Sequence, residues 1–121
     1  MTNLERLKMM LNNKEYFTDT EFEVFLSENG LVVTDTYIKV DNEINLLETT
    51  VAILESLSND VDMMRKISSD EIGLTTEEAF KYLATRIKNL NEKILTLKEM
   101  QESQEEYTNI RPIFFNGIIT K

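Results

Sequence analysis

The sequence contains no cysteine and no histidine, and these two absences exclude much common chemistry. Without cysteine there is no disulfide framework and no thiol nucleophile. Without histidine the most frequent general base of enzymes is missing, and so is a common ligand of zinc. Asp and Glu are numerous, but no carboxylate pair stands out as a candidate acid and base. We therefore expect a protein that is not an enzyme and that uses no cofactor.

Turn-forming residues are also scarce, because the chain has one Pro and three Gly. A β-sandwich or barrel needs more of them, whereas the abundant Leu, Glu, Lys and Asn favour helices. With 121 residues, of which 41% are hydrophobic and 29% charged, one domain around one core is expected. The composition therefore predicts an all-α fold.

Long apolar runs are absent as well. No window approaches the roughly 20 apolar residues of a membrane span. The first residues lack the apolar core of a signal peptide. Together with the lack of cysteine, these features predict an intracellular, soluble protein with no membrane partner.

Positive charge is in short supply, since 13 Lys and Arg face 22 Asp and Glu for a net charge of −9. Residues 107–121 contain Arg111 and Lys121 and no acid, so they carry +2 and the remainder carries −11. A body this acidic repels nucleic acid and anionic membranes unless its cations cluster. The cations of the last predicted helix are interrupted by glutamates, which favours a mixed solvated face.

Two acidic clusters are candidate metal sites, but neither has the spacing of an EF-hand loop. One is Asp60 with Asp62, and the other is Asp19, Glu21 and Glu23. In the second, acids in the first turn of a helix are favoured by the helix dipole, which accounts for Asp19 and Glu21. We expect no metal site and no small-molecule substrate.

Three Thr-x-x-Glu capping boxes mark the starts of helices, since in such a pair each side chain satisfies the other's free backbone N–H. The pairs are Thr2 with Glu5, Thr18 with Glu21, and Thr75 with Glu78. They predict a first helix over 3–11, a second over 19–29, and a last one from 75 to about Gln104. Gly30 provides the stop of the second helix.

A third helix is predicted over 41–67, where apolar residues recur every three or four positions. They are Ile44, Leu47, Val51, Leu54, Leu57, Val61 and Met64. Asn59-Asp60 is a possible break, but the pattern favours continuity. Residues 31–40 fit either a strand or a buried connection.

The last helix carries a heptad seam, because its apolar residues alternate steps of three and four. They are Phe80, Leu83, Ile87, Leu90, Ile94 and Leu97. The seam fits a coiled coil between chains or a face packed on the 41–67 helix. The wide apolar stripe of the latter favours packing within one chain. Residues 1–106 are thus predicted as a helical domain, a small bundle with two short N-terminal helices and two long antiparallel ones.

Residues 107–121 are predicted as a C-terminal docking arm, either extended or a β-hairpin. Asn116-Gly117 between apolar runs suits a type I′ turn, and Pro112 suits an edge strand. An isolated hairpin is marginal in water, so we expect the arm to dock on another polypeptide rather than on its own body. The predicted partner-binding residues are Tyr107, Ile110, Pro112, Ile113, Phe114, Phe115, Ile118 and Ile119.

In order and spacing the chain resembles the head–tail connector (adaptor) proteins of tailed bacteriophages. The likeness covers most of residues 4–95. The segments that carry it are Leu4-Glu5-Arg6-Leu7-Lys8, Thr18-Asp19-Thr20-Glu21-Phe22, Glu28-Asn29-Gly30-Leu31, Leu54-Glu55-Ser56-Leu57-Ser58-Asn59-Asp60 and Tyr82-Leu83-Ala84-Thr85-Arg86-Ile87-Lys88-Asn89-Leu90.

The resemblance implies a virion neck protein that is assembled in the host cytoplasm. Such subunits form a ring, usually of twelve copies, beneath the portal protein. The ring extends the DNA channel and presents a platform to the next neck protein. The acidic body adds the expectation that DNA passes through the lumen without specific binding. Terminal arms grip the portal or neighbouring subunits, a role that fits residues 107–121. The alternative is a small acidic inhibitor that mimics DNA and blocks a nucleic-acid-binding host protein.

Overall fold

The computed structural model describes the backbone of residues 1–70 and 74–115 and the side chains of 1–69 and 74–104. These residues form helices and no named strand, which confirms the predicted all-α fold. The helices are α1 Asn3–Met10, α2 Asp19–Glu28, α3 Lys39–Ser58, α4 Val61–Asp70 and α5 Thr76–Phe115.

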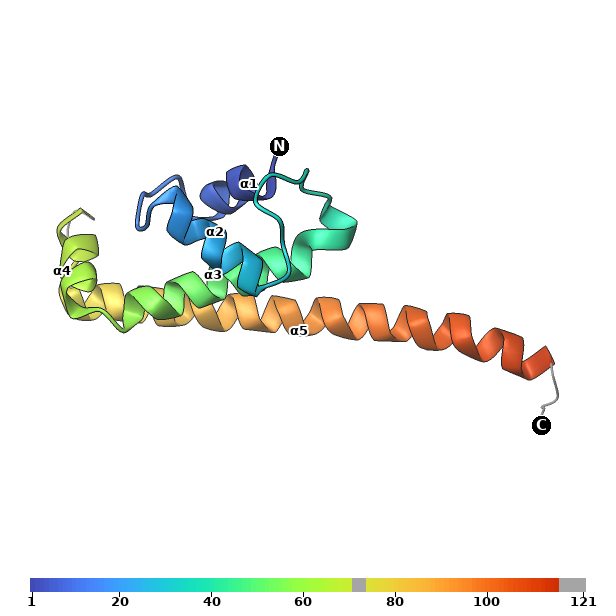
Figure 1. Cartoon of the computed structure of the whole chain (residues 1–121). Coiled ribbons are helices and arrows are strands. Elements are labelled where there is room, and N and C mark those ends of the chain that lie inside the picture. Colours follow the sequence, from blue (N-terminus) through green and yellow to red (C-terminus); the bar gives the residue numbers. More distant parts are fainter. Residues whose placement is uncertain (71–73, 116–121) are drawn as a thin grey trace.

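The helix α3 lies at the centre of the arrangement, and it contacts each of the other four helices. Figure 1 shows α5 as a long rod, with α3 running antiparallel along its first half. The short helices α1 and α2 lie on the side of α3 away from α5, and α4 sits near the beginning of α5. The predicted bundle of two short helices and an antiparallel long pair is therefore present.

Local sequence determines where three of the helices begin, as the capping boxes predicted. In each box the threonine N–H donates to the glutamate carboxylate over 2.8–2.9 Å. The glutamate N–H donates in return to the threonine hydroxyl over 3.1–3.2 Å. Two otherwise unpaired backbone donors are satisfied at each of these helix starts.

The same hydrogen bonds make the caps sensitive to pH. The backbone N–H and then the hydroxyl of each threonine lower the pKa of the paired glutamate below its ordinary value. A carboxyl whose pKa is lowered by folding stabilises the fold above its unfolded pKa. This contribution is lost as the pH falls through the lowered, folded pKa. Each cap should therefore be strongest at neutral pH and weaken in acid.

We expect Glu21→Gln to lower the free energy of unfolding at neutral pH, because the charged acceptor of the α2 cap is lost. As the pH falls from neutral through the lowered, folded pKa, the wild-type carboxyl becomes protonated, so the two proteins should converge in stability. Urea unfolding of both across this pH range measures the difference. Glu23→Gln, on the same helix but outside the cap, is the matched control. A difference for Glu21→Gln that stays constant with pH would contradict this account.

The connection between α2 and α3 is held against the N-terminus of the chain. Gly30 has a φ of +79°, which confirms the predicted helix stop. Thr2 and Thr36 then form an isolated antiparallel bridge. The buried Asn3 donates from Nδ2 to the carbonyl of Val32 over 2.8 Å. Residues 31–38 are thus a connection paired with the N-terminus, which settles the choice that the sequence left open.

The predicted continuity of the 41–67 helix is wrong, because α3 ends at Ser58 and α4 begins at Val61. The Asp60 carboxylate accepts the N–H of Met63 over 3.1 Å, so it provides an N-cap for a new helix. Figure 1 shows α4 turned out of the line of α3. After this turn Met64 is fully buried against the rest of the core.

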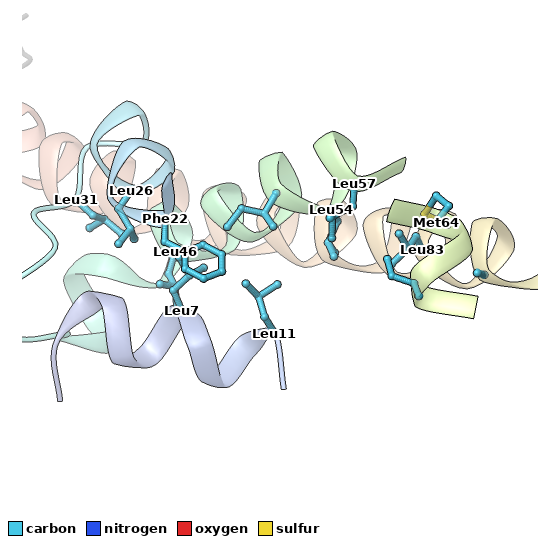
Figure 2. Close-up of a cluster of buried hydrophobic side chains, with 13 residues drawn as sticks. Leu7, Leu11, Phe22, Leu26, Leu31, Leu46, Leu54, Leu57, Met64 and Leu83 are labelled. Carbon is cyan, nitrogen blue, oxygen red and sulfur yellow. The ribbon is translucent and has the colours of Figure 1, made fainter. Parts of the chain in front are cut away.

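Side chains from all five helices meet in one hydrophobic core (Figure 2). The buried members are Leu7, Leu11, Phe22, Leu26, Leu31, Leu46, Ile53, Leu54, Leu57, Met64, Ile67, Ala79 and Leu83. A smaller cluster of Leu47, Val51 and Ile94 continues the contact between α3 and α5. The heptad seam of α5 therefore packs on α3 within one chain, as predicted.

Cations on α5 are tied to the other helices. Arg86 donates from Nη2 to the carbonyl of Met10 at the end of α1. Lys93 pairs with Glu43 of α3 over 3.6 Å. These contacts link α5 to the end of α1 and to α3.

The helix α5 continues to Phe115, well past the end predicted near Gln104. The backbone of 107–115 continues this helix. A helix that is already formed gains one hydrogen bond per added residue, except at Pro112, which has no N–H to donate. That residues 107–121 form an extended or hairpin docking arm stays a prediction. Residues 116–121, with the Asn116-Gly117 turn, lie outside the described residues.

Candidate functional site

The far end of α5 projects from the rest of the molecule. The helix has 40 residues, so it is about 60 Å long at 1.5 Å per residue. The helix α3 runs beside it only as far as Lys39, where α3 begins. In Figure 1 residues 105–115 stand clear of the other described helices. We call this segment the α5 tip, and at the same rise it is roughly 16 Å long.

A groove lies where α3 begins and where the α5 tip leaves the body, and we call it the α3–α5 groove. Its apolar residues are Val40, Ile44, Leu97 and Met100. Its polar residues are Lys39, Asp41, Glu43, Asn45, Glu48, Lys98, Gln101 and Gln104. The first half of α3 supplies one wall of the groove, and α5 supplies the other.

The apolar residues of this groove are poorly covered. Val40 is 81% exposed and Met100 is 57% exposed, while Ile44 and Leu97 are half-buried. Single exposed apolar side chains are normal on protein surfaces. Four that line one groove leave a contiguous apolar surface, which is typical of an interaction site.

The groove has a weakly acidic rim. Lys98 donates to Glu48 over 3.1 Å and so bridges the two walls. Among the described side chains, Asp41 in the first turn of α3 makes no ion pair. Three carboxylates and two ammonium groups line the groove, which gives it a net charge of −1.

The predicted partner-binding residues fall mainly on the projecting segment. Six of them, from Tyr107 to Phe115, lie along the helical backbone of the α5 tip. Ile118 and Ile119 lie outside the described residues. The α3–α5 groove was missed, because Val40 and Met100 are single apolar residues in polar sequence. Only the packing of α3 on α5 brings them together.

Within the part of the chain that the structure describes, no group of three or more acidic side chains lies close enough to hold a metal ion. No helix among these residues is long and apolar enough to cross a membrane.

No family model, curated protein or solved structure matches this chain. The likeness to head–tail adaptors accordingly stands on the sequence segments named above. What the chain does must follow from its own surfaces, and of these the α5 tip and the α3–α5 groove are the most distinctive.

Proposed function

We propose that this protein is a structural subunit of the head–tail adaptor kind, which assembles into a ring beneath a portal protein and performs no catalysis. The observation that carries the proposal is the α5 tip, a helical segment that leaves the body and has an apolar sequence. A subunit that acts alone has no need of such a projection.

An unaccompanied helical end of this kind is poorly stable by itself. Helices shorter than about 12–15 residues are marginal in water, and most helical stability in proteins comes from packing. The tip contains five large apolar residues, namely Tyr107, Ile110, Ile113, Phe114 and Phe115. Burying a side chain of this size contributes about 1.5–3 kcal/mol. A partner that covers several of them gains enough to offset the entropy lost on association.

In a ring, many weak contacts of this kind together give a stable assembly. In a closed assembly each tip contact becomes effectively intramolecular once its neighbours have formed, so weak contacts add up to a stable particle. A net charge of −9 also suits a channel that DNA traverses, because like charges repel and do not hold the duplex. In this proposal DNA passes through the lumen without specific binding.

The acidic surface also fits the alternative function, a DNA mimic that inhibits a nucleic-acid-binding protein. Such a mimic has no evident use for the α5 tip, because its partner surface would be basic and not apolar. Its binding would weaken steeply with salt, whereas apolar docking would not.

Native mass measurement of the purified chain, alone and with a candidate portal protein, tests the proposal. We expect a ring of many copies, twelve by the resemblance, either alone or on the portal. An inhibitor would stay small and would bind basic proteins in a salt-sensitive way. A chain that remains monomeric at all concentrations, with and without the portal, would overturn the proposal.

A further inference from the structure

We infer that the α3–α5 groove of one copy receives the α5 tip of a second copy. This inference rests on the proposed function, because it names the surface on which the projecting helix docks. Both surfaces belong to the same chain, so the complete junction is encoded in one subunit. Four observations support it.

The first observation is that a subunit cannot fill its own groove with its tip. Met100 in the groove and Phe115 at the end of the tip belong to one helix, 15 residues and about 22 Å apart. Because the tip belongs to the same helix and runs away from Met100, it cannot lie in the groove of its own chain. The tip of a second copy has no such constraint.

The second observation is a match of chemistry. The groove offers the four apolar residues named above. In the tip, Tyr107, Ile110 and Phe114 are spaced i, i+3 and i+7. This is the spacing of helices that lay an apolar face into a groove. The tip is helical over these positions, so no new secondary structure has to form on docking.

The third observation concerns charge. The groove carries −1, and its Asp41 has no ion pair among the described side chains. The tip, residues 105–115, contains Arg111 together with Glu105 and Glu106, so its net charge is also −1. The complementarity is therefore local, because Arg111 lies among the apolar residues of the tip and Asp41 is a carboxylate with which it can pair. Complementary charge fixes the orientation of a contact more than its strength.

The fourth observation is the position of the groove, which lies where α3 begins and beyond which α3 no longer packs on α5. An incoming helix laid there continues the line of α3 and keeps α5 packed against a neighbouring helix. Because tip and groove are different surfaces, the contact is heterologous, and its repetition generates a ring when the rotation closes.

The groove is tested by a double variant, Val40→Glu with Met100→Glu. Both side chains are largely exposed, so the body should stay folded, which circular dichroism checks. We expect the dissociation constant for self-association, measured by sedimentation, to rise at least about tenfold. The matched control is Val24→Glu with Leu95→Glu, at positions 52% and 59% exposed and outside the groove. The control should assemble as the wild type does.

A mixing experiment then tests the pairing directly. The groove double variant keeps its tip, and a chain truncated after Glu106 keeps its groove. Each should be monomeric alone, and the mixture should form a 1:1 pair. Failure of this pair to form, or a groove variant that assembles as well as the wild type, would overturn the inference.

The outcomes also separate this inference from the proposed function. If the wild type forms a ring and the groove variant still does, the proposed function stands and the docking of the tip in the groove is refuted. If the wild type forms only a closed dimer that requires both tip and groove, the docking is supported and the ring is refuted. If the wild type never associates, both are refuted.

Discussion

Truncation after Glu106 should leave a folded monomer that no longer assembles. The body keeps its core, because every buried side chain of the two clusters lies before residue 95. In Figure 1 the backbone of residues 107–115 stands clear of the other described helices, so the loss of helical circular dichroism should match that segment. Self-association should weaken by at least about 100-fold, since several large apolar anchors are lost together.

Substitution within the full-length chain sharpens this test. Phe114→Ser with Phe115→Ser should reproduce most of the loss, whereas Phe114→Leu with Phe115→Leu keeps apolar bulk and should retain assembly. Analytical ultracentrifugation of the three proteins provides the comparison. Intact particles built from the truncated chain would rule out the α5 tip as the assembly element.

Leu54→Ala should have the largest effect on stability. Leu54 is fully buried on α3, the helix that contacts all the others. Removing a buried leucine side chain to alanine costs about 2–5 kcal/mol, through lost apolar burial and the cavity that remains. Domains of this size are typically stable by only about 5–15 kcal/mol, so the variant should be near the limit of folding at physiological temperature.

Val40→Ala is the matched control for this prediction. It lies on the same helix and removes apolar atoms as well, but it is 81% exposed. Its effect on the free energy of unfolding should stay within about 0.5 kcal/mol. Chemical denaturation of both variants and the wild type measures the two changes in the free energy of unfolding. A cost below about 1 kcal/mol for Leu54→Ala would mean that the core is not centred on α3.

The parts of the fold that sequence predicted are those governed by neighbouring residues. The capping boxes needed only a threonine and a glutamate three positions apart. The stop at Gly30 needed only a residue that tolerates positive φ. The packing of α5 on α3 was predictable because both carry matching apolar stripes and no other helix offered an equal partner.

The parts that sequence did not predict depend on competition between signals. Val61 and Met64 continue the apolar period of α3, so periodicity alone predicted one continuous helix. The structure has a break after Ser58, and Asp60 caps the new helix α4. Over 107–115 two signals compete, because the β-forming residues and Pro112 favour an extended arm and the existing helix favours its own continuation. Local propensity is a weak guide where a long helix is already in place.

The α3–α5 groove could not be predicted for a different reason. Val40 and Met100 are 60 positions apart, and neither belongs to an apolar run. They share a surface only because α3 begins beside the point where α5 leaves the body. The pairing of residues 31–38 with the N-terminus is likewise set by tertiary contacts, as in the bridge of Thr2 with Thr36.

The unbroken backbone of α5 has a mechanical consequence. Between Thr76 and Arg111 the sequence contains neither glycine nor proline, so no hinge residue lies between the start of the tip and the part that packs on α3. Pro112, which has no backbone N–H, is the position of the tip that favours a bend. Up to Arg111 the helix acts as a lever, and a torque applied there is transmitted to the α3 contact. If a neighbour grips this part of the tip, the strain of one subunit is passed to the next through a stiff element instead of being absorbed by a loop.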